Sequence, residues 1–326
     1  MGVSLWIHGL LAGSTAFVVA AVLFGWGRRR AEKLASYGAA RTAANRRPPC
    51  VEAPATIAFL GDVQKGVRVV AGPIVEALAR ERVSFLVSSG DLASHGAAPY
   101  HGIVGRAFDR AGLAIPFLVA PGNHDVQPTR VRDPEPGRRL FESLWGPRTF
   151  AASVGPLVIL GCDNGGAALD DRQLDWIEHE LEIRPHAPWI LVIHRSPRNP
   201  LLEGHPAEAG TDRLFALFRR RRPECVVSGH LARDADVVID DVRYVVNADG
   251  GDVSGDPWLG PKTFRLLLAD VASDGHVSLR SVELVRRRDR SVAIDQFAVR
   301  LWSDSGRGFG RLLGLVGDAL LRPFAR

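Results

Sequence analysis

Residues 56–64 read TIAFLGDVQ, an apolar run typical of a buried strand that ends in Asp62 and Gln64. Open α/β folds place their chemistry at the carboxyl ends of strands, where loops aim side chains into a shared crevice. The stretch therefore favours an α/β fold with a functional loop at this point.

Four further blocks repeat this arrangement along the chain. SGDL at 89–92 follows VSFLVS, PGNHD at 121–125 follows AIPFLVA, IHRSP at 193–197 follows PWILV, and SGHLARD at 228–234 follows CVV. One such block alone is common turn chemistry, and a lone histidine is more often a hydrogen-bonded core residue. Five blocks in one order, each behind an apolar run, indicate a shared site. They deliver Asp62, Asp91, Asn123, His194 and His230.

The chemistry of these side chains predicts a metal centre. Asp, Asn and His suit divalent manganese, iron or zinc. A carboxylate shared by two cations holds them about 3.5–4 Å apart, the spacing at which a bridging hydroxide attacks phosphorus in line. Asp91 is the expected bridge. An imidazole can protonate the departing oxygen, and we assign that role to His124, with Asp125 beside it as orienter.

Taken together, the blocks resemble the calcineurin-like metallophosphoesterase superfamily, whose pattern is DxH, GDxx, GNH[DE], a lone His and GHxH. The match covers about residues 55–250, and VILGCDNGGAALDDRQLDWIEHEL resembles the family's strand, loop and QLxWLExxL helix. The resemblance implies an α/β fold, a two-sheet β-sandwich flanked by helices. It also implies hydrolysis of a phosphomonoester, phosphodiester or pyrophosphate with one or two divalent metal ions.

Carried over residue by residue, the resemblance gives one complete metal site, made of Asp91, Asn123, His194 and His230. The other site would hold Asp62, Gln64 and Asp91, but Ala232 stands where the family has its last histidine.

Three outcomes of this gap stay open. A nearby carboxylate can substitute, the second ion can arrive with the substrate's phosphate, or the protein keeps one ion and works poorly or not at all. The carboxylates available for the first outcome are Asp234, Asp249 and Asp252.

Substrate-facing residues are predicted less sharply. Arg195 follows His194 and either clamps a phosphate through its planar guanidinium or forms a surface ion pair. His95 and His101 either line the cleft or are solvated. Asp163 and Asn164 follow a strand, and positions similar to theirs border the pocket in the family.

The N-terminal segment predicts a membrane anchor over residues 1–27. Residues 3–26 carry no Asp, Glu, Lys or Arg and are long enough to cross a bilayer as a single helix. A signal peptide is disfavoured because no basic side chain precedes the apolar run. Arg28, Arg29, Arg30 and Lys33 follow it, so the positive-inside rule places the downstream domain in the cytoplasm.

The rest of the chain divides into three parts. We expect a basic juxtamembrane linker over residues 28–54, the metallophosphoesterase domain over 55–303, and a basic amphipathic helix over 304–326. The last helix either lies in a membrane interface or packs on the domain. VVIDDVRYVVN, TFRLLLADV, VSLRSVELV and SVAIDQFAV are β-rich and are expected to complete one sheet, with a hairpin turn at SDG, residues 273–275.

Other chemistries lack their signatures. The sequence contains no GxxxxGK[ST] loop and no GxSxG elbow, and its three cysteines have no CxxC spacing. Its formal charge of +5 is spread over several segments without an aromatic-interleaved groove, so no nucleic-acid partner is expected. The leading hypothesis is a membrane-anchored phosphoesterase acting on a phosphorylated small molecule or a lipid-linked substrate. The alternative, kept open by Ala232, is a catalytically lapsed domain that binds a phosphorylated ligand or a protein partner.

Overall fold

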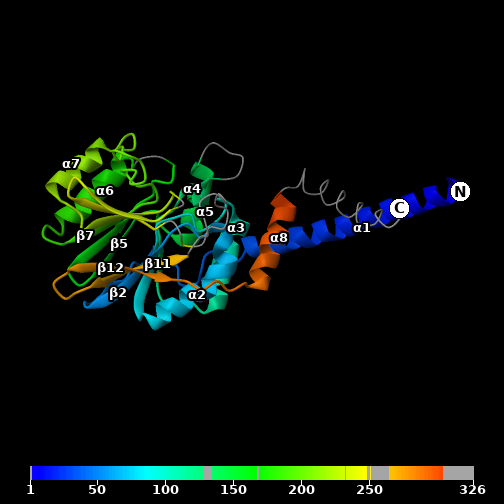
Figure 1. Cartoon of the computed structure of the whole chain (residues 1–326), viewed down its shortest axis with the longest axis horizontal. Helices are drawn as coiled ribbons and strands as arrows, with labels where there is room; N and C mark the ends of the chain where they lie inside the picture. The colour runs from blue at the N-terminus through cyan, green and yellow to red at the C-terminus, as the bar shows by residue number, and fades with distance from the viewer. Residues whose placement is uncertain are drawn as a thin grey trace.

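Two mixed β-sheets lie face to face at the centre of the computed structural model, with helices outside them (Figure 1). The structure describes residues 2–127, 134–166, 169–231, 233–247, 250 and 264–303, with the side chains of 2–13 and 303 left out. The expected α/β sandwich flanked by helices is therefore confirmed.

The larger sheet has seven strands in the order β1-β5-β6-β7-β8-β10-β9, and the smaller has five in the order β12-β11-β2-β3-β4. β6, β7, β8 and β10 run parallel to one another, as do β2, β3 and β4, so these strands share one carboxyl edge in each sheet. The strands span Cys50–Val51 (β1), Ala55–Leu60 (β2), Val83–Ser88 (β3), Phe117–Val119 (β4), Phe150–Val154 (β5), Leu157–Gly161 (β6), Trp189–Val192 (β7), Cys225–Ser228 (β8), Ala235–Ile239 (β9), Val242–Val246 (β10), Arg265–Val271 (β11) and Val277–Glu283 (β12).

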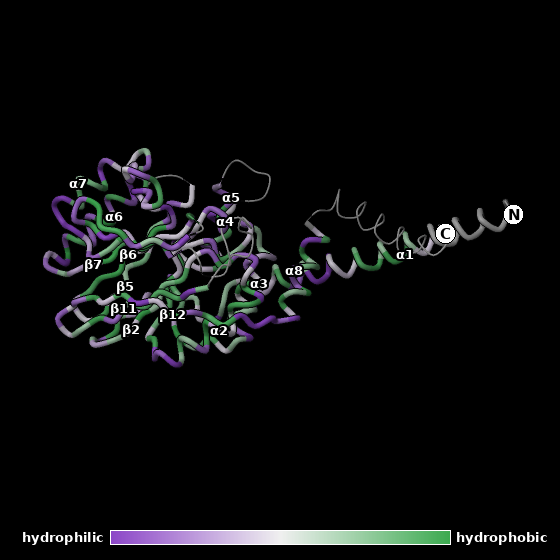
Figure 2. The backbone as a smooth tube through the Cα atoms, in the orientation of Figure 1, coloured by the Kyte–Doolittle hydropathy of each residue, from purple (hydrophilic) through white to green (hydrophobic). Residues whose placement is uncertain are grey.

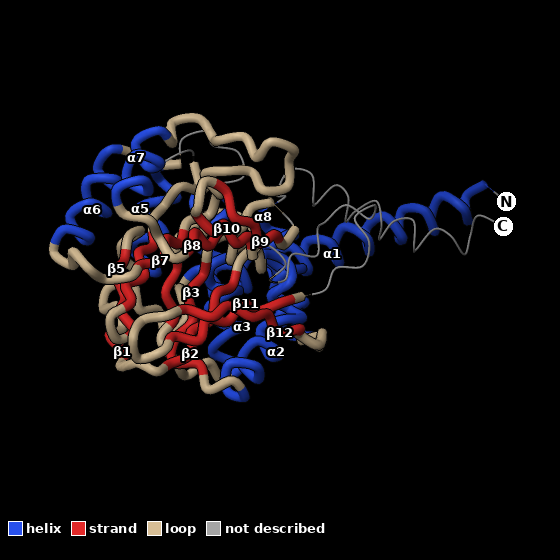
Figure 3. The backbone as a smooth tube through the Cα atoms, turned by 60° about the vertical axis from the view of Figure 1, so that its left-hand side comes forward, coloured by secondary structure: helices blue, strands red, loops and turns tan. Residues whose placement is uncertain are grey.

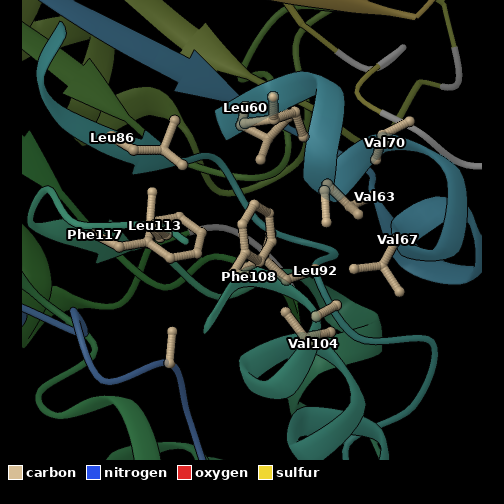
Figure 4. Packing of buried hydrophobic residues seen from close by; sticks show 14 of the residues in the cluster. Leu60, Val63, Val67, Val70, Leu86, Leu92, Val104, Phe108, Leu113 and Phe117 are labelled. Carbon is tan, nitrogen blue, oxygen red and sulfur yellow. The ribbon is translucent and has the colours of Figure 1, made fainter. Parts of the chain in front are cut away.

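Strand β2 shows how the sequence builds the layers. Successive side chains of a strand point to opposite faces. Ile57 and Phe59 accordingly pack between the two sheets, while Ala58 and Leu60 pack against helices. Figure 4 shows the helix side, where Leu60 lies near Val63 and Phe108. Because both faces of β2 are apolar, the run reads as continuously hydrophobic, which is typical of a strand buried on both sides.

Helices cover both outer faces (Figure 3). Those packed on the smaller sheet contribute Leu34, Val67, Phe108, Phe141 and Val299 to one core. The larger sheet is covered by two helices, which contribute Leu174 and Leu214 among others. The helices span Gly2–Ala35 (α1), Val67–Arg80 (α2), Ala98–Ala111 (α3), Asn123–Val126 (α4), Glu135–Trp145 (α5), Asp171–Glu182 (α6), Asp212–Arg220 (α7) and Arg290–Ser303 (α8).

Helix α1 extends away from the domain and is held at its base by α8 and α3 (Figure 1). Asp295 of α8 is 2% exposed and accepts hydrogen bonds from Arg30 of α1 at 2.6 Å and from Arg106 of α3 at 2.9 Å. Gly102 lets α3 approach α1, since a Cβ there would lie 1.8 Å from the carbonyl oxygen of Leu34. The base of α1 is therefore an integral part of the fold.

The predicted membrane span is not found among the described helices. Over the described part of the chain, no helix combines the length and hydropathy that a membrane crossing needs. The side chains of residues 3–13, which form the first half of the expected span, lie outside the described residues, as does the C-terminal helix expected over 304–326.

The segment expected as a linker, residues 28–54, is packed where the structure describes it. Residues 28–35 belong to α1, and Asn45 is 3% exposed. The Asn45 side chain donates to the carbonyl oxygens of Val119 and Pro147 and accepts from the amide of Val119. The division of the chain at 54 and 303 stays a prediction.

One of the four strands predicted in the C-terminal part is wrong, and so is the prediction that these strands complete one sheet. SVAIDQFAV lies in α8, where Val292, Asp295, Ala298 and Val299 are buried at helical spacing. Asp289 accepts hydrogen bonds from the amides of Ser291 and Val292, the pattern of a helix N-cap. The other three segments divide between the sheets: β9 and β10 join the larger, and β11 and β12 join the smaller, with the expected turn at 273–275 between β11 and β12.

Candidate metal centre

The loops after β2, β3, β4, β7 and β8 meet at one place between the carboxyl edges of the two sheets. Each loop carries one of the five side chains singled out in the sequence. Their meeting point is the Nε2 atom of His194, which lies 3.1 Å from Asn123 Oδ1, 3.2 Å from His230 Nδ1 and 3.4 Å from Asp91 Oδ2. Four donor atoms from four loops therefore converge.

The residues present fit a divalent cation. The ligand atoms of Asp91, His194 and His230 lie within 4.8 Å of one another. His194 is fully buried, and its Nδ1 lies 3.0 Å from the carbonyl oxygen of Ser89, which leaves Nε2 free to bind an ion. Metal-ligating histidines typically hold their second ring nitrogen in this way.

Two more oxygen donors border this group. Asp62 is 4% exposed and accepts a hydrogen bond from the amide of His230 at 2.8 Å. The side-chain nitrogen Nε2 of Gln64 lies 3.2 Å from Asp91 Oδ2. Rotation of the side-chain amide by half a turn would place its oxygen there instead. The structure thus brings together all six residues expected as ligands, and their role as ligands stays a proposal.

The backbone is strained at four of these six residues. Asp62, Gln64, Asp91 and His230 have φ values of 51°, 40°, 55° and 71°. Such conformations cost of order 1–3 kcal/mol each for non-glycine residues and cluster at functional sites.

Glycines give the carboxylates room. A Cβ on Gly122 would lie 2.2 Å from Asp91 Oδ1, and one on Gly229 would lie 2.3 Å from Asp62 Oδ2. A side chain at Gly122 or Gly229 would therefore collide with the carboxylates of the cluster.

Burial and charge shift the pKa values of the ligands. Burial lowers the pKa of His194, but the carboxylates of Asp91 and Asp62 outweigh it and raise that pKa to about 9. Burial raises the pKa of Asp91, but His194 outweighs it and the net shift is downward. Burial and then His194 lower the pKa of His230 to about 4. The cluster thus favours a positive charge at His194 Nε2. In this structure a proton on the imidazole supplies that charge, and a bound metal ion would take its place.

His124 and Asp125 have separate surroundings. His124 Nδ1 lies 3.0 Å from the carbonyl oxygen of Ser94, so Ser94, and not the expected Asp125, orients this imidazole. The carboxylate of Asp125 instead accepts from the amides of Ala93 and Gly122 at 2.8 and 2.9 Å. Asp125 thereby joins the second and third loops.

His101 lies in the core and does not line the cleft. Its side chain is 0% exposed, Nε2 lies 3.0 Å from the carbonyl oxygen of Asp125, and Nδ1 accepts from the indole of Trp145 at 3.1 Å. Burial lowers the pKa of His101 to about 4 from its usual 6.5.

We therefore expect His101 to make stability depend on pH. A histidine whose pKa is lowered by folding stabilises the protein fully above its unfolded pKa, and this contribution is lost as pH falls from 6.5 to about 4. His101→Gln cannot titrate. The difference in unfolding free energy between wild type and His101→Gln should change by up to about 3 kcal/mol between pH 7 and 4, to the disadvantage of wild type. Urea unfolding measures it, and a pH-independent difference would contradict the assignment. Burial raises the pKa of Asp125 to about 6, so this residue also makes stability depend on pH. Its contribution is present in both proteins and cancels from the difference between them.

Asn164 is a residue whose role sequence reasoning missed. Its Oδ1 accepts from the amides of His194 and Arg195 at 2.8 and 2.9 Å, and its Nδ2 donates to the carbonyl oxygen of Arg195 at 2.7 Å. It therefore fixes the loop that carries His194. The signals for it were its place in the loop after a strand and the family resemblance, which sets similar positions at the border of the pocket.

The remaining predicted residues have these positions. Arg195 donates to the carbonyl oxygen of Gly165 at 3.3 Å, and buried Asp163 pairs with Arg138 and Arg148. Asp234 lies 3.7 Å from Arg265. Ala232, Asp249 and Asp252 lie outside the described residues.

Comparisons with known proteins agree with the fold and the motifs. The model of the family described as calcineurin-like phosphoesterase matches residues 55–234, more than half of the chain. The chain therefore belongs to the calcineurin-like phosphoesterase family. The comparison with curated proteins finds no match.

Solved structures share the fold at low sequence identity. A dimetal phosphatase from Danio rerio is 12% identical with a TM-score of 0.50, over 71% of this chain and 99% of that chain. GAP50, the anchor in the inner membrane complex of Plasmodium, is 14% identical with a TM-score of 0.47, over 75% and 95%. A purple acid phosphatase from yellow lupin is 15% identical with a TM-score of 0.46, over 74% and 56%. At such identities the likeness concerns the fold alone.

Proposed function

We propose that this chain is a metal-dependent phosphoesterase that hydrolyses a phosphomonoester, phosphodiester or pyrophosphate. The observation that carries the proposal is the convergence of Asn123, His230 and Asp91 on Nε2 of buried His194. Such a set of nitrogen and oxygen donors suits manganese, iron or zinc. Family membership supports the same reaction class.

The residues divide into holders of ions and groups that handle the substrate. Asp91, Asn123, His194 and His230 would hold one ion, and Asp62 and Gln64 with Asp91 would contribute to a second. Bound divalent ions neutralise charge on the phosphoryl oxygens and make hydroxide available near neutral pH. Arg195, which follows His194, would orient the phosphate through its guanidinium.

His124 would protonate the departing oxygen. Its Nδ1 is held by the carbonyl oxygen of Ser94, so the proton to be transferred is the one on Nε2. After transfer the imidazole is neutral and keeps its hydrogen bond to Ser94.

A leaving-group comparison tests this role. We expect His124→Gln to lower kcat for an alkyl phosphoester by about 10²–10⁴-fold, and to affect a p-nitrophenyl ester much less, because nitrophenolate leaves without a proton. Metal content, measured by mass spectrometry, should be unchanged, since His124 is not a ligand. Equal losses on both esters would rule out the general-acid role.

Metal content and turnover test the function itself. The chain, purified with added manganese, should hold one or two ions and hydrolyse p-nitrophenyl phosphate or bis-p-nitrophenyl phosphate. Less than one ion per chain and no turnover would favour the alternative function, a lapsed domain that binds a phosphorylated ligand or a protein partner.

The membrane anchor and the cytoplasmic placement stay predictions. Val18 and Val22 of α1 are 59% and 62% exposed, and no charged side chain precedes Arg28. Retention of the chain in carbonate-washed membranes, with the domain protected from external protease in intact cells, is the expected result. Release by carbonate would contradict the anchor.

A further inference from the structure

An apolar pocket lies where α1, α8, α5 and the start of α3 meet. Its volume is about 380 Å³, within the range of small-molecule sites. Such sites are lined mainly by apolar side chains, and this one is lined by Ala31, Ala35, Ala98, Leu140 and Trp302, among others.

The pocket adjoins the side of the metal centre that holds His124. Gly96 lies in the pocket wall and directly follows His95, whose ring centroid is 6.2 Å from that of His124. The His95 ring also meets the edge of Tyr100 at 4.8 Å, on the same helix as Ala98. His95 therefore links the pocket wall, through Gly96, to the imidazole of His124.

The side chains that line the pocket favour an apolar occupant. Glu32 is the one charged residue in the described lining, and it is exposed and paired with Arg28 at 2.9 Å. Polar groups of a sugar or a base would find few hydrogen-bond partners among these side chains, so their burial here is unfavourable. A hydrocarbon chain gains free energy on the same transfer.

Helix α1 continues this apolar surface away from the domain. Val18, Val19 and Val22 are 59%, 38% and 62% exposed, and Figure 2 shows a hydrophobic section of α1 beyond α8. Ala31 and Ala35, farther along the same helix, form one wall of the pocket. One helix thus carries both an exposed apolar section and a wall of a pocket beside the metal centre.

We infer that the pocket receives the hydrocarbon chain of an amphipathic phosphoester whose phosphate lies at the metal centre. The inference rests on the proposed phosphoesterase function and names its substrate class. Held there, the hydrocarbon chain would extend from the pocket past His95 to the phosphate.

A chain-length comparison tests the inference. Ethyl and decyl p-nitrophenyl phosphates, below their micelle concentrations, are hydrolysed by the full-length protein with manganese. The decyl ester should have the higher kcat/KM by at least about tenfold, because each fully buried methylene contributes about a factor of four.

Two variants localise the effect. Ala98→Trp fills the pocket and Leu140→Asn makes its wall polar, and either should remove most of the decyl preference while leaving ethyl hydrolysis within about twofold. Ala272→Trp and Ile183→Asn alter exposed positions outside the pocket and should keep the preference. Equal rates for both esters in wild type, or a preference that both pocket variants retain, would overturn the inference while leaving the phosphoesterase function intact.

A direct binding measurement tests the pocket independently of catalysis. Dansylated undecanoic acid should bind wild type and both control variants with increased fluorescence, and bind Ala98→Trp and Leu140→Asn at least about tenfold more weakly. If no ester is hydrolysed but this pattern of binding is seen, the proposed function fails and the apolar-chain site stands. Absence of probe binding to the full chain would overturn the site, because the pocket would then be closed to outside ligands.

Discussion

His194→Ala is expected to abolish metal binding and to lower turnover to the background rate. Nε2 of His194 is the atom on which Asn123, His230 and Asp91 converge, and its imidazole is fully buried. Removing a residue that only hydrogen-bonds to a metal ligand lowers metal affinity by about 10–100-fold, so removing His194 itself should lower it further. Metal content after gel filtration and hydrolysis of bis-p-nitrophenyl phosphate with manganese are the measurements.

Two further variants make the result specific. His186→Ala removes an exposed histidine and should keep the metal content and activity of the wild type. Asp91→Asn keeps the shape of the side chain but removes its charge, so it tests the site where His194→Ala fails to fold. His194→Ala and Asp91→Asn proteins that retain the metal content and turnover of His186→Ala would refute the metal centre.

Asp295→Ala is expected to lower the unfolding free energy by about 3–5 kcal/mol, the usual cost of removing one partner of a buried ion pair. Asp295 is 2% exposed, and its loss leaves Arg30 and Arg106, 26% and 21% exposed, without their carboxylate. Both guanidinium groups would then be held partly out of water and without compensation. Urea unfolding followed by tryptophan fluorescence measures the change.

The matched control is Asp175→Ala. Asp175 also pairs with an arginine, Arg213 at 2.5 Å, but its side chain is 68% exposed, and exposed pairs contribute about 0–1 kcal/mol. Equal effects of the two substitutions would show that the Asp295 cluster does not hold α1 and α8 in place.

Asp295→Ala should also affect the metal centre. Gln296, next to Asp295, donates to the carbonyl oxygen of Lys65 at 3.1 Å, and Lys65 follows Gln64. Loosening α8 therefore frees the loop that carries Gln64. We expect Asp295→Ala to bind manganese more weakly even where it remains folded, as a titration at low temperature would show.

The convergence of the ligands could be predicted from the sequence because it follows from local rules. An apolar run predicts a buried strand, and parallel strands bring their carboxyl ends to one edge. Asp62, Asp91, Asn123, His194 and His230 each follow such a run and do meet in the structure. The family resemblance added the two-sheet arrangement, which periodicity alone only permitted.

Other features could not be predicted because their patterns are ambiguous or because the partner is distant in the chain. SVAIDQFAV has both alternating and helical apolar spacing, and only packing against α1 selects the helix. The sequence left His101 either lining the cleft or solvated, and only the structure encloses it in the core between Trp145 and the backbone of Asp125. Ser94 orients His124 through a carbonyl group, which every residue carries and no motif can reveal.

The sequence by itself determined the strands that precede the site, the types of side chain that meet there and their order along the chain. Each of these depends on residues a few positions apart, within reach of hydrophobic period and turn chemistry. Only the tertiary structure decided that Asn164 fixes the His194 loop, that Asp295 joins α1 to α3, and that an apolar pocket lies beside His95. The hydrogen bonds of Asn164 and Asp295 join residues that are 30 and 265 positions apart, and only the packing of the whole core sets which residues meet.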